Sequence, residues 1–287
     1  RTEGTITQLV RDKVNLLTDG GGPKMHLWRA PHRNDDMWDY RSWQDYGLDD
    51  LKYMTLSTYL IQPQLSIVRI EAVIQATGKK GFSATHSAIY TIYGDGSILI
   101  DNAIAPMGRR IPLARMGVRM LLDPKLDQFS YLGRGPMENY ADRKRGFDVG
   151  LYSSSVREQM TPYAKPMECG NHEDVRWAAV GGKRMPTLLA QADGDSMQVS
   201  ALPYTDEVMT PLEYPVDLPA STSTVLTLAA RTLGVGSNGC GPRPLEKYIV
   251  WSDPATFSYV LRLLPAGQKN LSSVGRLPVP VQLLLAV

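Results

Sequence analysis

The feature that most constrains the fold of this chain is its succession of short β-prone segments broken by turn residues. Residues 65–74 alternate apolar and polar side chains in the manner of a strand. Residues 86–93 and 97–102 are β-prone runs on either side of Gly94-Asp95-Gly96. Because a turn of this kind between two β-prone runs favours antiparallel pairing, these residues predict a β-hairpin.

The β pattern continues through the rest of the chain, and helical signals are scarce. A second hairpin is predicted between residues 187–191 and 196–202, across Asp193-Gly194. Residues 43–51 have the character of a turn or a short helix, while 20 prolines and 25 glycines fit many turns. Further strands are predicted at residues 128–132, 224–230, 247–251 and 257–264. The predicted fold class is therefore all-β and mostly antiparallel.

Length and composition allow one large domain. The chain has 287 residues, 43% of them hydrophobic, which is ample for a core. No linker-like change of composition precedes residue 266, so we expect one domain over residues 1–266. Residues 267–287 are predicted to form a tail or an extra edge strand. The chain begins at Arg1 rather than at a methionine, so we expect it to be a piece of a longer polypeptide.

Charge and cysteine content exclude several classes of partner. The 31 basic and 29 acidic residues are spread along the chain, so we expect no face for nucleic acid and none for a membrane surface. No stretch approaches the roughly 18 consecutive apolar residues of a membrane span. Cys169 and Cys240 are the only cysteines, and without a CxxC or Cys/His cluster a zinc site is not expected. Two cysteines leave open both their pairing and the compartment.

Three loop segments combine turn glycines with dense polar and aromatic side chains. They are residues 27–36, residues 131–143 followed by 161–163, and residues 166–177. In order, they resemble the RAPxxND, LGxGPxENYxDR, TPY and PxExG…RxW/Y signatures of the C-terminal small-chain domain of family 2 β-galactosidases. Residues 234–242 resemble the late GxG…(W or C)GP loop of the same domain. The matches cover residues 4–265, and GPMENYADR is the most specific of them.

The resemblance implies a galactose-mutarotase-like supersandwich, in which two large antiparallel sheets pack face to face. It also implies that the acid/base and nucleophile glutamates, and the ligands of the active-site magnesium, belong to a preceding (β/α)8 barrel. A barrel of that kind needs about 250 residues of alternating strands and helices, which this β pattern does not contain. We therefore expect no catalytic residue, metal ligand or cofactor in this chain. Its expected partners are the barrel of the same parent polypeptide and a galactoside, in a homo-oligomeric parent.

The carboxylates of the matched loops are candidates for catalysis by residue type alone. Retaining glycoside hydrolysis needs two carboxyl groups about 5 Å apart across the scissile bond. We expect these side chains instead to accept hydrogen bonds from loop backbone or to pair with Arg134, Arg143 and Arg176. The carboxylates are Glu138, Asp142, Glu168, Glu173 and Asp174. Arg29 and Arg134 are expected to clamp carboxylates or loop carbonyls through planar bidentate bonds.

Two segments are predicted to approach the sugar pocket of the parent enzyme. Residues 35–43 resemble a loop beside the active-site entrance, and residues 236–242 resemble a segment that often offers a tryptophan as a sugar platform. Cys240 stands near that position, so ring stacking from it is lost, and Trp38 or Trp43 would substitute. The predicted substrate-binding residues are Asp35, Asp36, Trp38, Trp43, Asn238 and Cys240. The alternative is that the aromatic residues of segment 35–43 only pin the loop to the sandwich.

Two other functions are compatible with this fold class. One is a free-standing carbohydrate-binding module, and the other is a mutarotase-like enzyme, which uses histidines with a glutamate. None of the four histidines lies in a recognisable mutarotase motif. His32 and His172 are expected to be hydrogen-bonded or solvent-facing loop residues, while His26 and His86 flank predicted strands. Trp28, Trp177 and Trp251 are expected to pack in the core or at an interface.

Overall fold

Two antiparallel sheets form the body of the molecule in the computed structural model, which describes residues 4–194, 196–236 and 241–279. The larger sheet has nine strands, in the order β11 (Asp148–Ser155), β10 (Gln128–Gly135), β13 (Trp177–Gly182), β14 (Met185–Asp193), β18 (Ala255–Leu264), β7 (Ile98–Met107), β6 (Ser83–Tyr93), β5 (Ile67–Thr77) and β4 (Lys52–Gln64). The smaller has five, in the order β12 (His172–Val175), β15 (Met197–Leu202), β16 (Thr224–Thr232), β9 (Arg115–Leu122) and β3 (Lys24–His26). The predicted class, all-β with two large antiparallel sheets, is confirmed.

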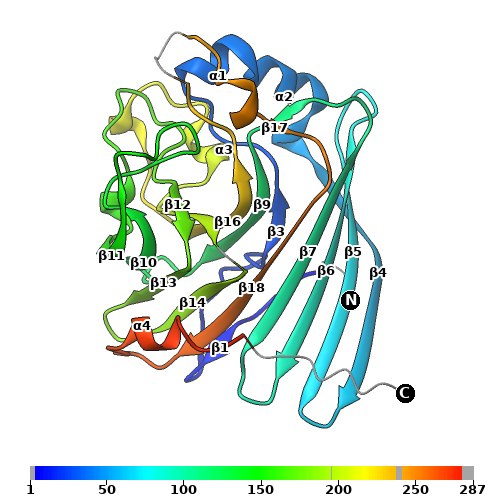
Figure 1. The fold of residues 1–287 in the computed structure, drawn as a ribbon, viewed down its shortest axis with the longest axis vertical. Coiled ribbons are helices and arrows are strands. Elements are labelled where there is room, and N and C mark those ends of the chain that lie inside the picture. The colour runs from blue at the N-terminus through cyan, green and yellow to red at the C-terminus, as the bar shows by residue number, and fades with distance from the viewer. Residues whose placement is uncertain (1–3, 195, 237–240, 280–287) are drawn as a thin grey trace.

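Short elements complete the fold. Two small ribbons pair β1 (Val10–Arg11) with β2 (Val14–Asn15) and β8 (Pro112–Leu113) with β17 (Val250–Trp251). The helical segments are α1 (Arg33–Trp38), α2 (Tyr40–Tyr46), α3 (Asp206–Met209), α4 (Leu271–Val274) and the 3-10 turns η1 (Leu48–Asp50), η2 (Arg157–Gln159), η3 (Pro215–Asp217) and η4 (Glu246–Tyr248). Helices α1 and α2 cap one end of the sandwich, and α4 lies toward the other (Figure 1). Among the described helices, none has the length and apolar character needed to cross a bilayer.

The main core fills the space between the sheets. Tyr131 and Tyr259 from the nine-stranded sheet and Met120 and Leu228 from the five-stranded sheet belong to this one buried cluster. A second cluster lies under α2 and η1 and includes Trp43 and Leu48. Since burial of apolar surface is the main favourable term in folding, this second cluster fixes the helical cap on the sandwich.

The predicted hairpin around Gly94-Asp95-Gly96 is confirmed as the β6–β7 connection, where Ile92 pairs with Ile98. The Asp95 carboxylate accepts the Ser97 backbone N–H at 2.8 Å and the Ser97 hydroxyl at 2.6 Å. Gly96 adopts a φ of 83°, a conformation that favours glycine. Local residues therefore specify this turn completely.

The second predicted hairpin, between residues 187–191 and 196–202, is wrong. Strand β14 pairs with β13 and β18 in the large sheet, whereas β15 pairs with β12 and β16 in the small one. The chain thus crosses from one layer to the other after Asp193. All six residues of β15 are buried. The strand therefore has no alternation of buried and exposed residues from which its place in the small sheet could be predicted.

Other predictions of local structure are confirmed or corrected at their boundaries. The helical expectation for residues 43–51 is met by α2 and η1. The strand predicted at residues 247–251 is reduced to the two residues of β17, because η4 occupies its beginning. In the predicted tail, residues 271–274 form α4 rather than an edge strand, with the Asn270 side chain capping the Ser273 N–H at 3.2 Å. Residues 280–287 lie outside the described part of the chain.

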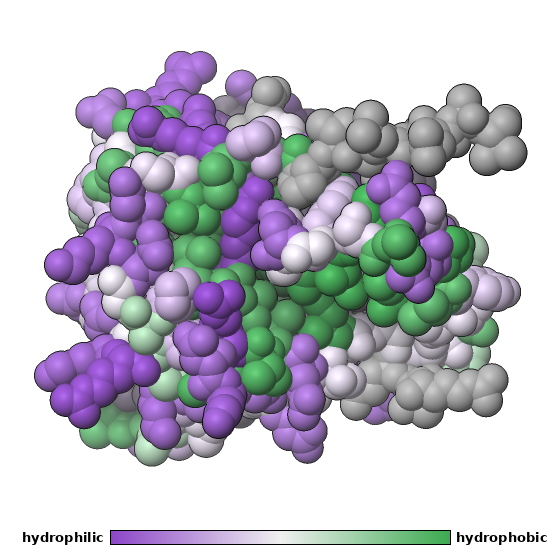
Figure 2. Space-filling model, turned by 90° about the horizontal axis from the view of Figure 1, so that it is seen from below, coloured by the Kyte–Doolittle hydropathy of each residue, from purple (hydrophilic) through white to green (hydrophobic). Residues whose placement is uncertain are grey.

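The two ends of the sandwich differ in character. Figure 2 looks into the end opposite α1 and α2, where apolar side chains gather in a hollow. Strand β4, at the edge of the large sheet, exposes Tyr59 by 62% and Leu60 by 70%. Polar and charged side chains from the matched loops converge instead at the capped end, where the candidate site lies.

Candidate functional site

Helix α1 begins directly after Arg29-Ala30-Pro31 because its first turn is capped from both directions. The His32 ring accepts the backbone N–H groups of Asn34 at 3.2 Å and Asp35 at 3.4 Å. The Asp35 carboxylate in turn accepts the His32 N–H at 3.3 Å, which completes a reciprocal capping box. This cap buries Asn34 and Asp35 and leaves Trp38, at the end of the helix, on the surface.

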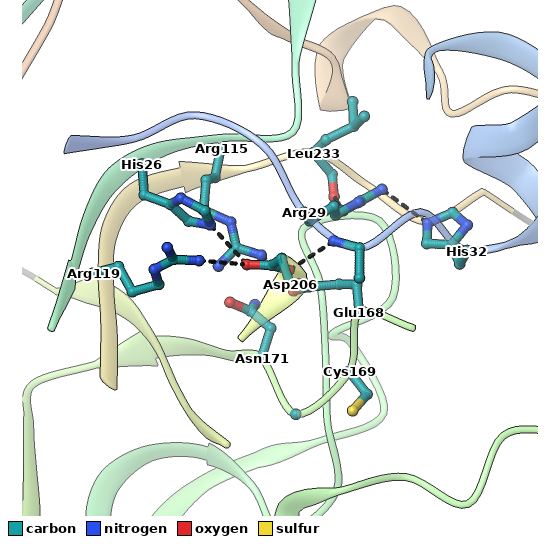
Figure 3. Close-up of polar contacts among 12 residues, drawn as sticks. His26, Arg29, His32, Arg115, Arg119, Glu168, Cys169, Asn171, Asp206 and Leu233 are labelled. Atoms are coloured by element: carbon teal, nitrogen blue, oxygen red, sulfur yellow. Dashed lines mark hydrogen bonds and ion pairs between the residues drawn. The ribbon is translucent and has the colours of Figure 1, made fainter. Parts of the chain in front are cut away.

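The guanidinium of Arg29 ties α1 to the loop of residues 233–243, called here the late loop. Arg29 is fully buried and makes two bonds of 2.9 Å to the Asp35 carboxylate. It also donates to the backbone carbonyl of Leu233 at 2.7 Å (Figure 3). A further bond reaches the Gly234 carbonyl at 3.0 Å. The predicted clamp by Arg29 is therefore confirmed, and it holds a carboxylate and loop carbonyls at once.

Two further side chains bind the described stems of the late loop, residues 233–236 and 241–243. Asp142 accepts the backbone N–H groups of Val235 at 3.1 Å and Gly236 at 2.7 Å. The Asn34 amide donates to the carbonyl oxygens of Val235 at 2.9 Å and Pro242 at 3.3 Å. Asn34 therefore connects the two stems to each other and to α1.

This grip explains the two glycines of the GxG pattern. A Cβ at Gly234 would lie 2.5 Å from a carboxylate oxygen of Asp142, closer than real Cβ contacts allow. A Cβ at Gly236, whose φ is 77°, would lie 1.9 Å from the Asn34 amide nitrogen. The spacing is thus a consequence of the close approach of Asp142 and Asn34 to the backbone.

The two tryptophans proposed as sugar platforms have different surroundings. Trp38 is 49% exposed, and a Cβ at Gly241 would lie 3.6 Å from its ring carbon Cζ2. Trp43 is fully buried in the second core cluster and donates its Nε1–H to the Pro112 carbonyl at 3.0 Å. Because Trp43 is fully buried, it has no free ring face for a ligand. Its contacts are those expected of a residue that pins segment 35–43 to the sandwich.

The remaining predicted substrate-binding residues are placed as follows. Asp35 is buried with its carboxylate bound to Arg29. Asp36 is exposed on α1, and partial burial raises the pKa of its carboxyl. Asn238 and Cys240 lie outside the described residues. The structure thus brings the 35–43 segment and the stems of the late loop together, with Trp38 at their junction.

A pocket of about 280 Å³ opens beside α1, and two glutamates line it together with His32 and Arg33. Glu138 is one of them, and both of its carboxylate oxygens are occupied. Its Oε1 accepts bonds from Arg143 at 2.6 Å and from the Tyr163 hydroxyl. Its Oε2 accepts the Thr161 hydroxyl at 2.9 Å and the Gly170 N–H at 2.8 Å. Four donors on one buried carboxylate are the arrangement of a structural hub rather than of a nucleophile.

The second glutamate of the pocket, Glu168, is buried against Arg115, whose guanidinium donates to Oε2 (Figure 3). Tyr140 donates to the other oxygen at 3.4 Å. Burial raises the pKa of Glu168 to about 7, and Arg115 opposes the rise. A raised carboxyl pKa is typical of catalytic acids, yet only 4% of Glu168 is exposed. Its geometry is that of a buried ion pair that anchors the 166–170 loop.

Asp206, at the start of α3, completes this buried network. Its carboxylate lies 2.7 Å from His26 Nε2 and 3.5 Å from Arg119 (Figure 3). It also accepts the Ala30 N–H at 2.7 Å. Burial lowers the pKa of His26 to about 4, so its ring is neutral at pH 7 and donates a hydrogen bond to Asp206. The network fixes β3, and hence the loop that leads to α1, onto the small sheet.

The predicted structural role of the other loop carboxylates is largely confirmed. Asp174 pairs with Arg134 at 2.5 Å, as expected for the clamp by Arg134. Three partners differ from those expected: Glu168 pairs with Arg115, Glu173 pairs with Lys144 at 3.2 Å, and Arg176 donates to the backbone carbonyl of Asp174 instead of to a carboxylate. The partners that sequence reasoning missed are Arg115, Lys144 and Asp206. None belongs to a recognisable local pattern, because each meets its partner across a long stretch of sequence.

The histidines do not form the couple that a mutarotase-like mechanism requires. His172 lies buried in β12, not in a loop, and its Nε2 is 2.6 Å from the Gln159 side-chain oxygen. His86 lies within β6 and bonds Asn102 at 3.0 Å. In the described ranges, each histidine is hydrogen-bonded to a group other than a glutamate. Over the same residues, no three His, Cys, Asp or Glu side chains converge as metal ligands would.

The three remaining tryptophans pack as expected. Trp28 and Trp177 are buried, Trp28 in the cluster under the helical cap and Trp177 against β14. Trp251 is half-buried, lies 4.4 Å from the Arg110 guanidinium and donates to Glu246 at 2.7 Å. These contacts are those of structural side chains rather than of platforms for a sugar.

Comparison with known proteins adds a sequence match along most of the chain. Residues 1–262 match the family described as beta galactosidase small chain. The beta-galactosidase of Priestia megaterium is 31% identical over 243 residues, which are 83% of this chain and 22% of that protein. That of Actinobacillus pleuropneumoniae is 31% identical over 228 residues, or 78% of this chain and 22% of that protein. The chain therefore spans about a fifth of the length of these relatives.

The solved structures add a weak likeness. A putative aldose 1-epimerase from Escherichia coli K12 aligns over 73% of this chain and 69% of its own, at a TM-score of 0.38 and 7% identity. A likeness at this level carries no argument about function.

Proposed function

The chain belongs to the beta-galactosidase small-chain family, and from that premise we propose that it is a non-catalytic domain of a β-galactosidase. In this proposal it forms one wall of a galactoside site, while the groups that transfer protons lie elsewhere in the parent polypeptide. The observation that carries the proposal is the saturation of the pocket glutamates. Glu138 accepts four hydrogen bonds and Glu168 is buried against Arg115, so neither carboxylate is available to a substrate.

The partner that this role requires is a catalytic (β/α)8 barrel in the same polypeptide. The two catalytic glutamates and the ligands of the magnesium ion would belong to that barrel. The contacts of this chain support the assignment, since the matched-loop carboxylates Asp35, Glu138, Glu168 and Asp174 are all held in ion pairs with arginines. A homo-oligomeric parent enzyme remains part of the proposal.

Trp38 is the residue of this chain that we expect to touch the sugar. It is 49% exposed beside Gly241, where segment 35–43, which resembles a loop beside the active-site entrance, meets the segment that resembles the sugar-platform loop. An indole face there would bury the apolar C–H surface of a pyranose ring, the contact that aromatic platforms make with sugars. Trp38 would thus supply the stacking surface that Cys240 does not.

The test is made in the full-length polypeptide that carries this chain, with a chromogenic β-galactoside as substrate. We expect hydrolysis, and we expect Trp38→Ala to raise KM by about fivefold to tenfold, the equivalent of about 1 kcal/mol of lost stacking. Tyr59→Ala is the matched control, since Tyr59 is 62% exposed on β4, the edge strand of the large sheet. The control should leave KM unchanged.

Two results would contradict the proposal. One is a full-length polypeptide that folds but hydrolyses no β-galactoside. The other is sub-millimolar binding of galactose to the isolated chain in a calorimetric titration, which would favour the free-standing carbohydrate-binding module. An unchanged KM in Trp38→Ala, with hydrolysis intact, would remove Trp38 from the sugar site and leave the domain assignment standing.

A further inference from the structure

Two side chains, Asn34 of α1 and Asp142, hold the described stems of the late loop through backbone groups. The Asn34 amide donates to Val235 and Pro242, one residue on each stem. Asp142 accepts two successive N–H groups on the first stem. Contacts to the backbone of the described stems fix the position of those stems independently of their side chains.

A second tie joins the other stem to the end of α1. Arg243 donates to the Asp39 carboxylate at 2.8 Å, and Asp39 is only 3% exposed in its side chain. Asp39 follows Trp38 directly and is the C-cap of α1. The helix that presents the Trp38 ring and the two described stems of the late loop are therefore held as one unit.

We propose that Asn34 and Asp142 are positioning residues for the sugar wall. Asn34 ties both stems of the late loop to α1, and Asp142 holds the backbone of the first stem, so that the Trp38 ring and the backbone at Gly241 present one continuous face. The ligand class is a hexopyranoside with an apolar C–H face, a β-galactoside in the parent enzyme. This inference rests on the proposed function. It goes beyond it by assigning the shape of the site to two side chains that make no contact with the sugar.

The clamp itself is tested in the isolated chain by amide hydrogen exchange. The N–H groups of Val235 and Gly236 donate to Asp142, so we expect Asp142→Ala to make them exchange at least about tenfold faster. Asp142→Asn keeps one acceptor oxygen and should restore part of the protection. Asp148→Asn, an exposed position at the start of β11, is the matched control and should leave both amides unaffected. Unchanged exchange in Asp142→Ala would overturn the clamp, whatever the function of the chain.

The positioning role is tested in the full-length polypeptide through the separation of KM from kcat. We expect Asn34→Ala and Asp142→Ala to raise KM about tenfold and to leave kcat within about twofold, because they disturb uniform binding and not the reacting groups. Asp142→Asn should recover part of the affinity. Faster exchange with an unchanged KM would overturn the positioning role and leave the β-galactosidase assignment intact. Absence of hydrolysis in the parent sequence itself would instead contradict the proposed function, without altering the exchange result.

Discussion

Glu138→Gln is expected to lower the free energy of unfolding of the isolated chain by about 3 kcal/mol. The carboxylate serves four donors, and only 6% of its side chain is exposed. A glutamine offers one acceptor oxygen, and its amide hydrogens would face the donors on the other side. Buried donors such as the Gly170 N–H would lose their partner, and an unsatisfied buried group costs more than the bond itself contributes. Urea unfolding followed by tryptophan fluorescence measures the loss.

The matched control for this variant is Glu158→Gln, which alters an exposed carboxylate in η2 and should leave the urea midpoint unchanged. The same substitution also separates structure from catalysis. In the full-length polypeptide, below its melting temperature, Glu138→Gln should keep kcat within about twofold, whereas a catalytic carboxylate would lose about a thousandfold or more. A loss of that size in a folded variant would show that Glu138 takes part in the reaction.

Arg29→Lys is expected to be at least as damaging, with a loss of about 3–5 kcal/mol in the free energy of unfolding. The guanidinium is completely buried and bonds Asp35, Leu233 and Gly234 at once. A lysine keeps the charge but offers a single nitrogen, so it cannot make the bidentate bond and reach the two carbonyls together. The Asp35 carboxylate would lose its bidentate bond, and at least one of the acceptors that Arg29 serves would remain buried without a partner.

Arg110→Lys provides the comparison for Arg29→Lys. Arg110 also makes a bidentate pair, to Asp253 at 2.8 and 2.7 Å, but both side chains are exposed. Water can form the hydrogen bonds to Asp253 that a lysine cannot, so the urea unfolding curve of Arg110→Lys should match that of the parent chain. If the two variants had the same free energy of unfolding, burial would not explain the contribution of Arg29 to stability.

The parts of the fold that sequence predicts are those encoded by neighbouring residues. Gly94-Asp95-Gly96 specifies its own hairpin because Asp95 bonds Ser97 within the turn. The turn after Asp193 carries similar residues, yet the chain there changes sheets. What distinguishes the two is the set of strands that pair with β14 and β15, and these strands are distant in the sequence. No local pattern contains that information.

The candidate site divides in the same way. Arg29 and Asp35 lie six residues apart in one motif, and their pairing follows from it. Asp206 contacts His26 across 180 residues of sequence, and Arg115 contacts Glu168 across 53. No local spacing of residues predicts either contact. Trp38 and Trp43 have the same chemistry and neighbouring positions. Only the packing of α2 on the second core cluster shows which of the two rings is buried.

The measurement that bears most directly on this account is the turnover of a chromogenic β-galactoside by the purified, folded chain alone. If the chain only forms one wall of the sugar site, and its carboxylates are held in structural bonds, the isolated chain should release no more product than buffer does. Saturable release by the isolated chain, lost in folded Glu138→Gln or Glu168→Gln, would contradict it and place the chemistry within these residues.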